Sequence, residues 1–174
     1  AIEAAKGGVL FIDEAYSLFT NDKDGDKRDF GNRVIETLLP KLSDDNFGTI
    51  VILAGYPAEM KLLMESNPGL QSRFPFTFHF EDYTPEELLE IAELTVHREG
   101  YQFTDEAREA LFALIKKEYK TRDRHFGNAR FVNRLISSQI LPAMATRLAN
   151  DGIYEMGNPD IQLFTTIERT DIPS

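Results

Sequence analysis

A run of four apolar residues that ends abruptly in two carboxylates constrains this chain more than any other feature. Val9 to Ile12 is continuously apolar, and Asp13 and Glu14 follow it directly. Short runs of this kind are typical of strands that are buried on both faces of a parallel sheet. Ligands of open α/β sheets bind beyond the carboxyl ends of such strands. The run therefore predicts a parallel sheet and a candidate ligand site at Asp13 and Glu14.

The first eighty residues alternate between strand-like and helix-like patterns. We expect strands at residues 9–12, 49–54 and 76–80, helices at residues 34–42 and 58–65, and a polar loop at residues 20–29. Pro40 should bend the first helix near its end, and Asn67-Pro68-Gly69 should break the second. Strands that alternate with helices predict an α/β unit with parallel strands, which we place at residues 1–81.

From residue 82 onward the pattern is helical, which predicts a separate all-α domain at residues 82–150. Thr84 and Glu87 form a capping box with Pro85 at the first helical position, and Thr104 should cap a second helix. A third helix is expected from about residue 129, interrupted near Pro142 and resuming through Leu148. Residues 151–174 are predicted to form a C-terminal tail, whose clear apolar anchors are Ile161, Leu163 and Phe164.

Charge and composition narrow the possible partners. The formal net charge of −10 disfavours a nucleic-acid surface, because an acidic protein is repelled by a duplex. One span is basic, which we interpret as a solvated helix face; its members are Lys116, Lys117, Lys120, Arg122, Arg124, Arg130 and Arg134. Cysteine is absent and the three histidines lack ligand spacing, so zinc is not expected. No stretch approaches the ~20 apolar residues that cross a membrane, and a cytoplasmic location is expected.

The two carboxylates at the end of the first strand suit the hydrolysis of a nucleoside triphosphate. That reaction needs a carboxylate near Mg²⁺, which offsets phosphate charge, and a group that orients or deprotonates the attacking water. Asp13 suits the first task and Glu14 the second. The alternative interpretation is that Asp13 caps the helix that follows the strand.

Four segments, in order, resemble the CbxX/CfxQ group of AAA+ ATPases, which includes red-type Rubisco activase, sporulation stage V protein K and type VII secretion ATPases. Residues 7–18, GGVLFIDEAYSL, are similar to its Walker B segment, and residues 53–56, LAGY, to the strand end that carries sensor 1. Residues 65–74, ESNPGLQSRF, resemble its arginine-finger segment, and residues 127–134, GNARFVNR, resemble sensor 2. Together these segments span nearly all of residues 1–150.

The resemblance implies a role for several residues. Arg73 would be an arginine finger, whose planar guanidinium reaches the nucleotide of the neighbouring subunit; the alternative is an ordinary surface arginine. Arg130 would contact the γ-phosphate from the helical lid, with Arg134 as its rival and a surface ion pair as the alternative for either. Tyr56 would stand at sensor 1, unless it merely packs at the strand end. The implied ligands are ATP and Mg²⁺, and the implied partners are further copies in a ring, a hexamer, and a protein client.

The sequence contains no G-x-x-x-x-G-K-[ST] loop, whose backbone amides and lysine cradle phosphates. In the family this loop lies ahead of Walker B, so we expect that residues 1–174 are part of a longer ATPase and hydrolyse little or nothing alone. The sheet should then expose unpaired edges and apolar surface. Two alternatives stay open: a non-catalytic assembly module of AAA+ origin, and a DNA-handling protein that uses the basic span, which the net charge disfavours.

Overall fold

The computed structural model describes residues 2–19, 25–44, 46–123, 126–155 and 160–173. The chain divides into two compact units, residues Ala1–Phe80 and Glu81–Ser174. Each unit has its own hydrophobic cluster, so each is described by itself.

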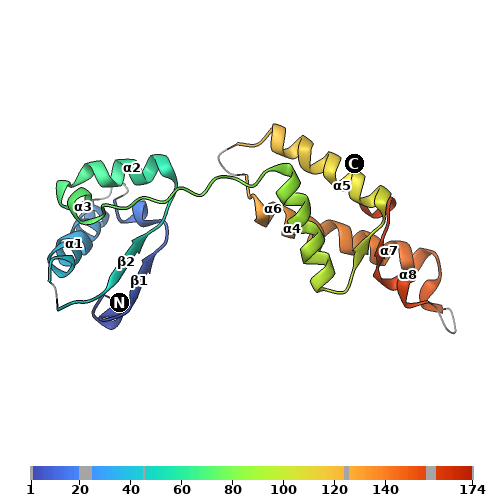
Figure 1. Ribbon diagram of the computed structural model, residues 1–174, viewed down its shortest axis with the longest axis horizontal. Coiled ribbons are helices and arrows are strands. Elements are labelled where there is room, and N and C mark those ends of the chain that lie inside the picture. Colours follow the sequence, from blue (N-terminus) through green and yellow to red (C-terminus); the bar gives the residue numbers. More distant parts are fainter. Residues whose placement is uncertain (1, 20–24, 45, 124–125, 156–159, 174) are drawn as a thin grey trace. The chain divides into compact units, whose positions relative to one another are not determined.

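The first unit is a short parallel sheet with helices packed on one of its faces (Figure 1). Its elements in chain order are η1 (Glu3–Ala5), β1 (Val9–Ile12), η2 (Ala15–Phe19), α1 (Gly25–Leu42), β2 (Ile50–Leu53), α2 (Pro57–Ser66) and α3 (Pro68–Arg73). β1 and β2 pair in parallel, in a register that places Val9 opposite Ile50 and Ile12 opposite Leu53. The parallel α/β unit expected from the sequence is thus confirmed.

Two local expectations for this unit are wrong. Residues 76–80 are not a strand, because no described strand pairs with them and a ladder needs a partner. Residues 25–29 belong to α1 rather than to a loop; the rest of that expected loop, residues 20–24, lies outside the described residues. The break expected at Asn67-Pro68-Gly69 is confirmed, because α2 ends at Ser66; Asn67 also begins α3, since its side chain accepts from the N–H of Gly69 and Pro68 is at the first position.

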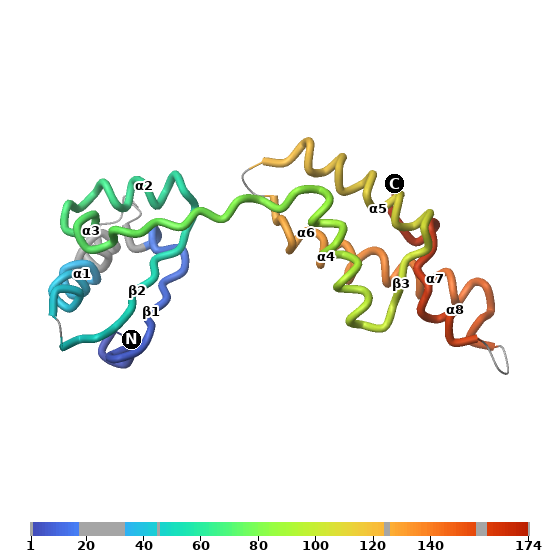
Figure 2. The backbone as a smooth tube through the Cα atoms, viewed as in Figure 1, coloured from blue at the N-terminus to red at the C-terminus, as the bar shows by residue number. Residues whose placement is uncertain are grey.

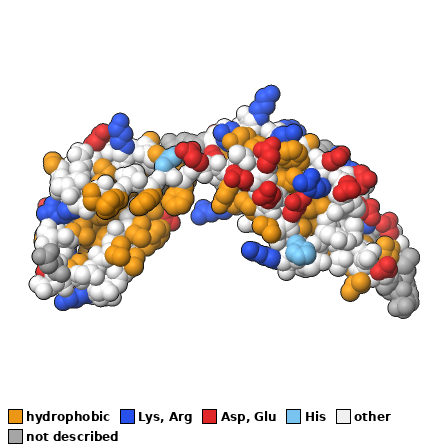
Figure 3. Space-filling view, in the orientation of Figure 1, with side chains coloured by type: hydrophobic (Ala, Val, Ile, Leu, Met, Phe, Trp, Pro, Cys, Tyr) orange, Lys and Arg blue, Asp and Glu red, His pale blue; other side chains and the backbone are white. Residues whose placement is uncertain are grey.

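The sheet buries one face and exposes the other. Leu10, Ile12, Val51 and Leu53 alternate with more exposed neighbours, and the face of Ile12 and Leu53 packs against α1, α2 and α3 through Ile35, Leu63 and Leu70. On the opposite face Val9, Phe11, Ile50 and Ile52 are exposed. Burial of β1 on both faces was therefore a wrong prediction, whereas the expected exposed apolar surface is confirmed. Figure 3 shows hydrophobic side chains gathered on this unit.

The second unit is a helical bundle that also contains a two-stranded parallel ladder. Its elements are α4 (Pro85–Arg98), β3 (Gln102–Phe103), α5 (Asp105–Lys120), α6 (Ala129–Leu135), a π-helical turn η3 (Ile136–Ile140), α7 (Leu141–Asn150), η4 (Ile153–Glu155), α8 (Ile161–Thr165), β4 (Thr166–Ile167) and η5 (Arg169–Asp171). The capping box at Thr84 and the cap at Thr104 are both present. Pro142 has no backbone N–H to donate to the preceding turn of helix. The π turn lies directly ahead of it, where the regular hydrogen-bond pattern is interrupted.

The last residues of the chain pack into the core of this bundle. Ile153, Ile167 and Ile172 are buried in the same cluster as Leu111 and Ile140. The backbone tube in Figure 2 follows this segment back alongside the earlier helices of the unit. Parallel pairing of β4 with β3 places Ile167 opposite Phe103, and this register turns the isoleucine inward.

Two of the three expected anchors of the tail were wrong. Ile161 is 75% exposed and Leu163 is 40% exposed, while Phe164 is partly buried and lies 5.6 Å, between ring centroids, from Tyr154. α8 is only five residues long, so its helical turn presents one apolar side chain to the core and leaves the others in solvent.

A buried ion pair fixes this returning segment to α7. Arg147 donates from Nε and Nη2 to the two carboxylate oxygens of Asp171, both at 2.9 Å, and from Nη2 to the carbonyl of Thr166 at 3.0 Å. Asp171, which is 2% exposed, also accepts from the N–H of Glu168. The hydrogen bond with Asp171 raises the pKa of Arg147. Because every oxygen of Asp171 has a partner, the pair is well satisfied in spite of its burial.

Asp171→Ala should destabilise the bundle by about 2–4 kcal/mol, because it removes the buried partner of Arg147 and leaves only the more exposed carboxylate of Glu168, at 3.2 Å, to pair with it. The matched control is Glu93→Ala, which removes the partner of the exposed Arg108 and should cost less than about 1 kcal/mol. Urea unfolding followed by far-ultraviolet circular dichroism measures both. Equal losses in the two variants would contradict the assignment.

Candidate active site

The parallel register of β1 and β2 brings two sequence motifs to one edge. Both strands end at this edge, β1 at Ile12 and β2 at Leu53. The N–H of Ala54 donates to the carbonyl of Ile12, and the N–H of Ala15 donates to the carbonyl of Ala54, both at 2.9 Å. These bonds hold the residues after β1 beside the residues after β2. The carboxylates Asp13 and Glu14 therefore lie next to the Gly55-Tyr56 segment.

Glu14 has an unusual backbone conformation. Its φ angle is 48°, in the left-handed region that side chains other than glycine, asparagine and aspartate seldom adopt. Its N–H donates to Oδ1 of Asp13 at 2.9 Å, and its carbonyl accepts from the N–H of Ser17 at 2.7 Å. The bond from Ser17 closes the first turn of η2, which begins at Ala15. Strained residues of this kind concentrate at functional sites.

Gly55 is required by close packing. A Cβ at this position would lie 2.7 Å from a ring carbon of Tyr16 and 2.8 Å from the sulfur of Met60. The rings of Tyr16 and Tyr56 are 6.2 Å apart between centroids. Tyr56 is 47% exposed and stands at the N-cap position of α2, where its carbonyl accepts from the N–H of Met60. The strand end thus presents two phenol rings beside the two carboxylates.

Negative charge collects at this edge. Burial raises the pKa of Tyr16 most, and the charges of Glu14, Tyr56, Glu59 and Asp13 raise that pKa further. A carboxylate pair that already disfavours a neighbouring phenolate is a natural place for a cation. Among the described residues no group of three or more His, Cys, Asp or Glu side chains could hold a metal ion by itself. Mg²⁺ commonly takes one or two carboxylates together with phosphates and water, so Asp13 fits that kind of site.

Arg73 lies on a different element of the same unit, at the end of α3. Its Nε donates to the hydroxyl of Ser43 at 2.7 Å, and its Nη1 donates to the carbonyl of Gly69 at 3.1 Å and to the hydroxyl of Ser72 at 3.4 Å. The side chain is exposed. These acceptors are all neutral, so they orient the guanidinium without cancelling its charge.

Arg130 and Arg134 lie one turn apart on α6, in the second unit. Both are exposed, and within the described part of the chain neither forms an ion pair with a carboxylate. The alternative that either is a surface ion pair finds no support among the described residues.

Both units match known family models. Residues 1–82 match the model of the ATPase family associated with various cellular activities, AAA, and residues 84–174 match the model of the AAA lid domain. The chain belongs to the AAA ATPase family. Its first unit is the AAA domain and its second unit is the AAA lid.

Several curated relatives align with this AAA chain. It is 39% identical over 171 residues to a CfxQ homologue of Galdieria sulphuraria, covering 98% of this chain and 53% of the relative. It is 42% identical over 148 residues to stage V sporulation protein K of Bacillus subtilis, covering 84% and 44%. It is 38% identical over 172 residues to the protein CbbX of Cereibacter sphaeroides, covering 98% and 52%. The chain thus spans about half the length of these relatives.

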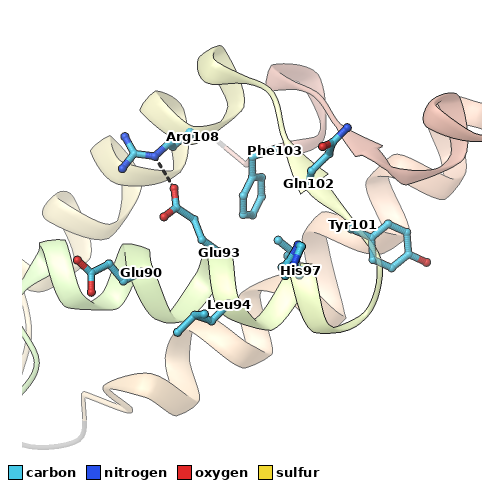
Figure 4. Close-up of a pocket in the computed structure, with 9 residues that line it drawn as sticks. Glu90, Glu93, Leu94, His97, Tyr101, Gln102, Phe103 and Arg108 are labelled. Atoms are coloured by element: carbon cyan, nitrogen blue, oxygen red, sulfur yellow. Dashed lines mark hydrogen bonds and ion pairs between the residues drawn. The ribbon is translucent and has the colours of Figure 1, made fainter.

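The AAA lid also contains a groove of about 460 Å³ that none of the expected site residues lines. It lies between α4, β3 and the start of α5, where Leu94, Tyr101 and Phe103 provide apolar surface and Glu93 pairs with Arg108 (Figure 4). The carboxylate edge is a separate feature of the AAA domain. No described helix is long and apolar enough to cross a membrane.

Reasoning from the sequence missed two residues at the sites. Tyr16 lies within the Walker B-like segment, three residues after Asp13, yet its contact with Gly55 depends on the bond that holds the start of η2 beside Ala54. Asn128 lies within the sensor 2-like segment, and its φ of 53° and side-chain partners appear only in three dimensions. Each stands inside a motif that the sequence already singled out.

Glu14→Gln should lower the pKa of Tyr16, because the negative charge of Glu14 disfavours the phenolate. Burial, the larger cause, remains, so the pKa should stay above its ordinary value. NMR titration of tyrosine Cζ in a ¹³C-labelled chain measures the shift. Glu65→Gln, on the exposed face of α2, is the control and should leave Tyr16 unchanged. A Tyr16 pKa equal in all three proteins would mean that Glu14 does not face this ring.

Proposed function

We propose that this chain carries the metal-and-water half of the ATP site of an AAA+ ATPase. The observation that supports the proposal most directly is the position of Asp13 and the strained Glu14 at the carboxyl edge of β1, beside Gly55 and Tyr56. The phosphate-binding half would come from outside residues 1–174, since these residues contain no phosphate-binding loop.

Each residue of the edge has a distinct task in this proposal. Mg²⁺ would supply positive charge that offsets the charge of the phosphates. Asp13 would hold that ion through the carboxylate oxygen that does not accept from Glu14. Glu14 would orient the attacking water and accept its proton, and its left-handed backbone would aim the carboxylate away from the strand. Tyr56 would stand at sensor 1 and donate a hydrogen bond from its phenol to the water or the phosphate.

The arginines would complete the site from other elements. Arg73 would act as an arginine finger on the nucleotide of a neighbouring copy, a role that suits an exposed guanidinium oriented by neutral acceptors. Arg130 would contact the γ-phosphate from the lid, with Arg134 one turn further along α6 as the second candidate. Such a division of the site requires a neighbouring copy, and the assembly that we propose is a hexameric ring.

The client that we propose is another protein. Among the relatives, one from Cyanidioschyzon merolae is named a ribulose bisphosphate carboxylase/oxygenase activase. A protein named for activating an enzyme supports the general idea that ATP hydrolysis in this family drives the remodelling of a protein.

The water-activating role of Glu14 is tested in a longer protein in which a phosphate-binding loop and its strand are joined ahead of Ala1. Glu14→Gln should lower ATP turnover by about 10²–10⁴-fold, because it removes the base, while nucleotide binding is retained. Glu65→Gln is the control, with the same change of charge on α2. Turnover is followed by phosphate release, and binding by a fluorescent ATP analogue. Unchanged turnover in Glu14→Gln would favour the non-catalytic assembly module instead.

The trans role of Arg73 is tested by mixing subunits of the same longer protein. Arg73→Ala should lower turnover by about 10³-fold or more in a ring of identical copies. Mixing it with Glu14→Gln subunits should restore part of the activity, since an intact Glu14 can then meet an intact Arg73 across an interface. Arg98→Ala, on the lid, is the matched control and should behave like the parent. Mixtures no more active than either variant would contradict a finger that acts between copies.

A further inference from the structure

The residues just ahead of Arg130 form a tight turn with an unusual centre. The N–H of Arg130 donates to the carbonyl of Gly127 at 2.9 Å, and Asn128 between them has φ 53° and ψ −127°. These angles match the first central position of a type II′ turn, which favours glycine and asparagine. Gly127 is also confined, since a Cβ there would lie 3.2 Å from the N of Phe131. The turn therefore sets where α6 starts and where Arg130 emerges.

Asn128 occupies the N-cap position of α6 but does not cap it. An N-cap asparagine ordinarily has an extended backbone and accepts from an N–H in the first helical turn. Here the side chain makes no such bond and the backbone φ is positive. Its side-chain amide instead forms hydrogen bonds with another segment of the lid.

Both ends of the Asn128 amide bind the segment that enters the lid. Oδ1 accepts from the N–H of Tyr83 at 3.2 Å, and Nδ2 donates to Oδ1 of Asp82 at 2.9 Å. These contacts join residues 45 and 46 positions apart in the sequence. The other carboxylate oxygen of Asp82 lies 3.6 Å from Nε of Arg122.

Arg122 is itself anchored at the end of α5. Its Nη1 donates to the carbonyl of Tyr119 at 2.8 Å, and its guanidinium carbon lies 3.7 Å from the centroid of the Tyr119 ring. Asp82 is thus held from two sides, by the amide of Asn128 and by a stacked guanidinium. The entry segment, the end of α5 and the start of α6 meet at this carboxylate.

We propose that Asn128 is a positioning residue that locks the entry segment of the lid, Asp82–Tyr83, to the turn that carries Arg130. The inference rests on the proposed function only in naming Arg130 as the residue that reads the nucleotide. Residues 82 and 83 continue the chain from the AAA domain, so a displacement of this segment is transmitted through Asn128 to the start of α6. This accounts for the Gly127-Asn128 pair, which the ATPase chemistry leaves without a task.

Hydrogen exchange of the 174-residue chain, measured by NMR without nucleotide, tests the lock. Asn128→Gly keeps the turn, because glycine adopts its angles freely, but removes both side-chain bonds. The Tyr83 amide should then exchange about tenfold faster, while the core amides of Leu111 and Ile115 keep their protection. Asn128→Ala also strains the turn, so protection of the Arg130 amide should fall as well. Unchanged exchange at Tyr83, or an equal rise throughout the lid, would overturn the proposal.

Exchanging the amide and the carboxylate between positions 82 and 128 provides a rescue experiment for the Tyr83 hydrogen bond. Asn128→Asp alone places two carboxylates together and should free the Tyr83 amide. The double variant Asp82→Asn/Asn128→Asp restores a carboxylate–amide pair and an acceptor for Tyr83, so protection there should return. If Asn128 contributed only general stability, the double variant would exchange like the single one, and that result would overturn the proposal.

The link to Arg130 has its own measurement. Asp82→Ala, far from Arg130 in sequence, should shift and broaden the amide signal of Arg130, whereas the control Asp105→Ala at the start of α5 should not. An Arg130 signal that is the same in both variants would overturn the positional role. No nucleotide is present in these experiments, so a failure of the ATP-site assignment would leave these results unchanged, and a failure here would leave the Glu14 and Arg73 experiments unaffected.

Discussion

The parallel pairing of β1 with β2 is the constraint on which the candidate site depends. Parallel strands end at the same edge of a sheet, so main-chain pairing makes neighbours of residues 41 positions apart in the sequence, such as Ile12 and Leu53. The backbone bonds from Ala54 to Ile12 and from Ala15 to Ala54 extend this pairing past the strands. The conformation of Glu14 follows from them, because the chain must turn sharply after β1 to enter η2. The site is therefore positioned by main-chain geometry, and side chains such as Tyr16 fill the space that remains.

The same small sheet leaves apolar surface exposed to solvent. Phe11 and Ile52 lie on its open face, and each buried residue of this size would contribute roughly 1.5–3 kcal/mol. Phe76, Phe78 and Phe80 alternate as in a strand and are also exposed, with Phe80 at 91%. The first unit thus has a smaller core than its composition allows, whereas the lid buries its helices thoroughly and closes with the Arg147–Asp171 pair. The two units therefore differ in how much of its own hydrophobic surface each one buries.

Local sequence signals predicted the elements well and their tertiary environment less well. The apolar runs that became β1 and β2, the box at Thr84 and the cap at Thr104 were all identified, since each depends on residues within a few positions. Residues 76–80 had the alternation of a strand, but pairing depends on a partner that the pattern does not contain. Ile161 was chosen as an anchor by hydropathy, while the register of β4 against β3 buries Ile167 instead. The partners of Asn128 were equally inaccessible, because they lie some forty-five positions away.

The carboxylates at the end of β1 and the proposed site arginines carry opposite charges. Burial raises the pKa of Tyr16 most, and the nearby charges of Glu14 and Asp13 raise it further. Arg73 and Arg130 have the opposite sign, but they lie on α3 and α6 and are exposed, where water screens them. Phosphate oxygens would satisfy both kinds of group, the carboxylates through a cation and the guanidinium groups directly. In the proposed ATPase, hydrolysis would depend on the movement of the elements that carry the arginines. A lock such as Asn128, which ties the start of α6 to the entry of the lid, then determines how faithfully that movement reaches Arg130.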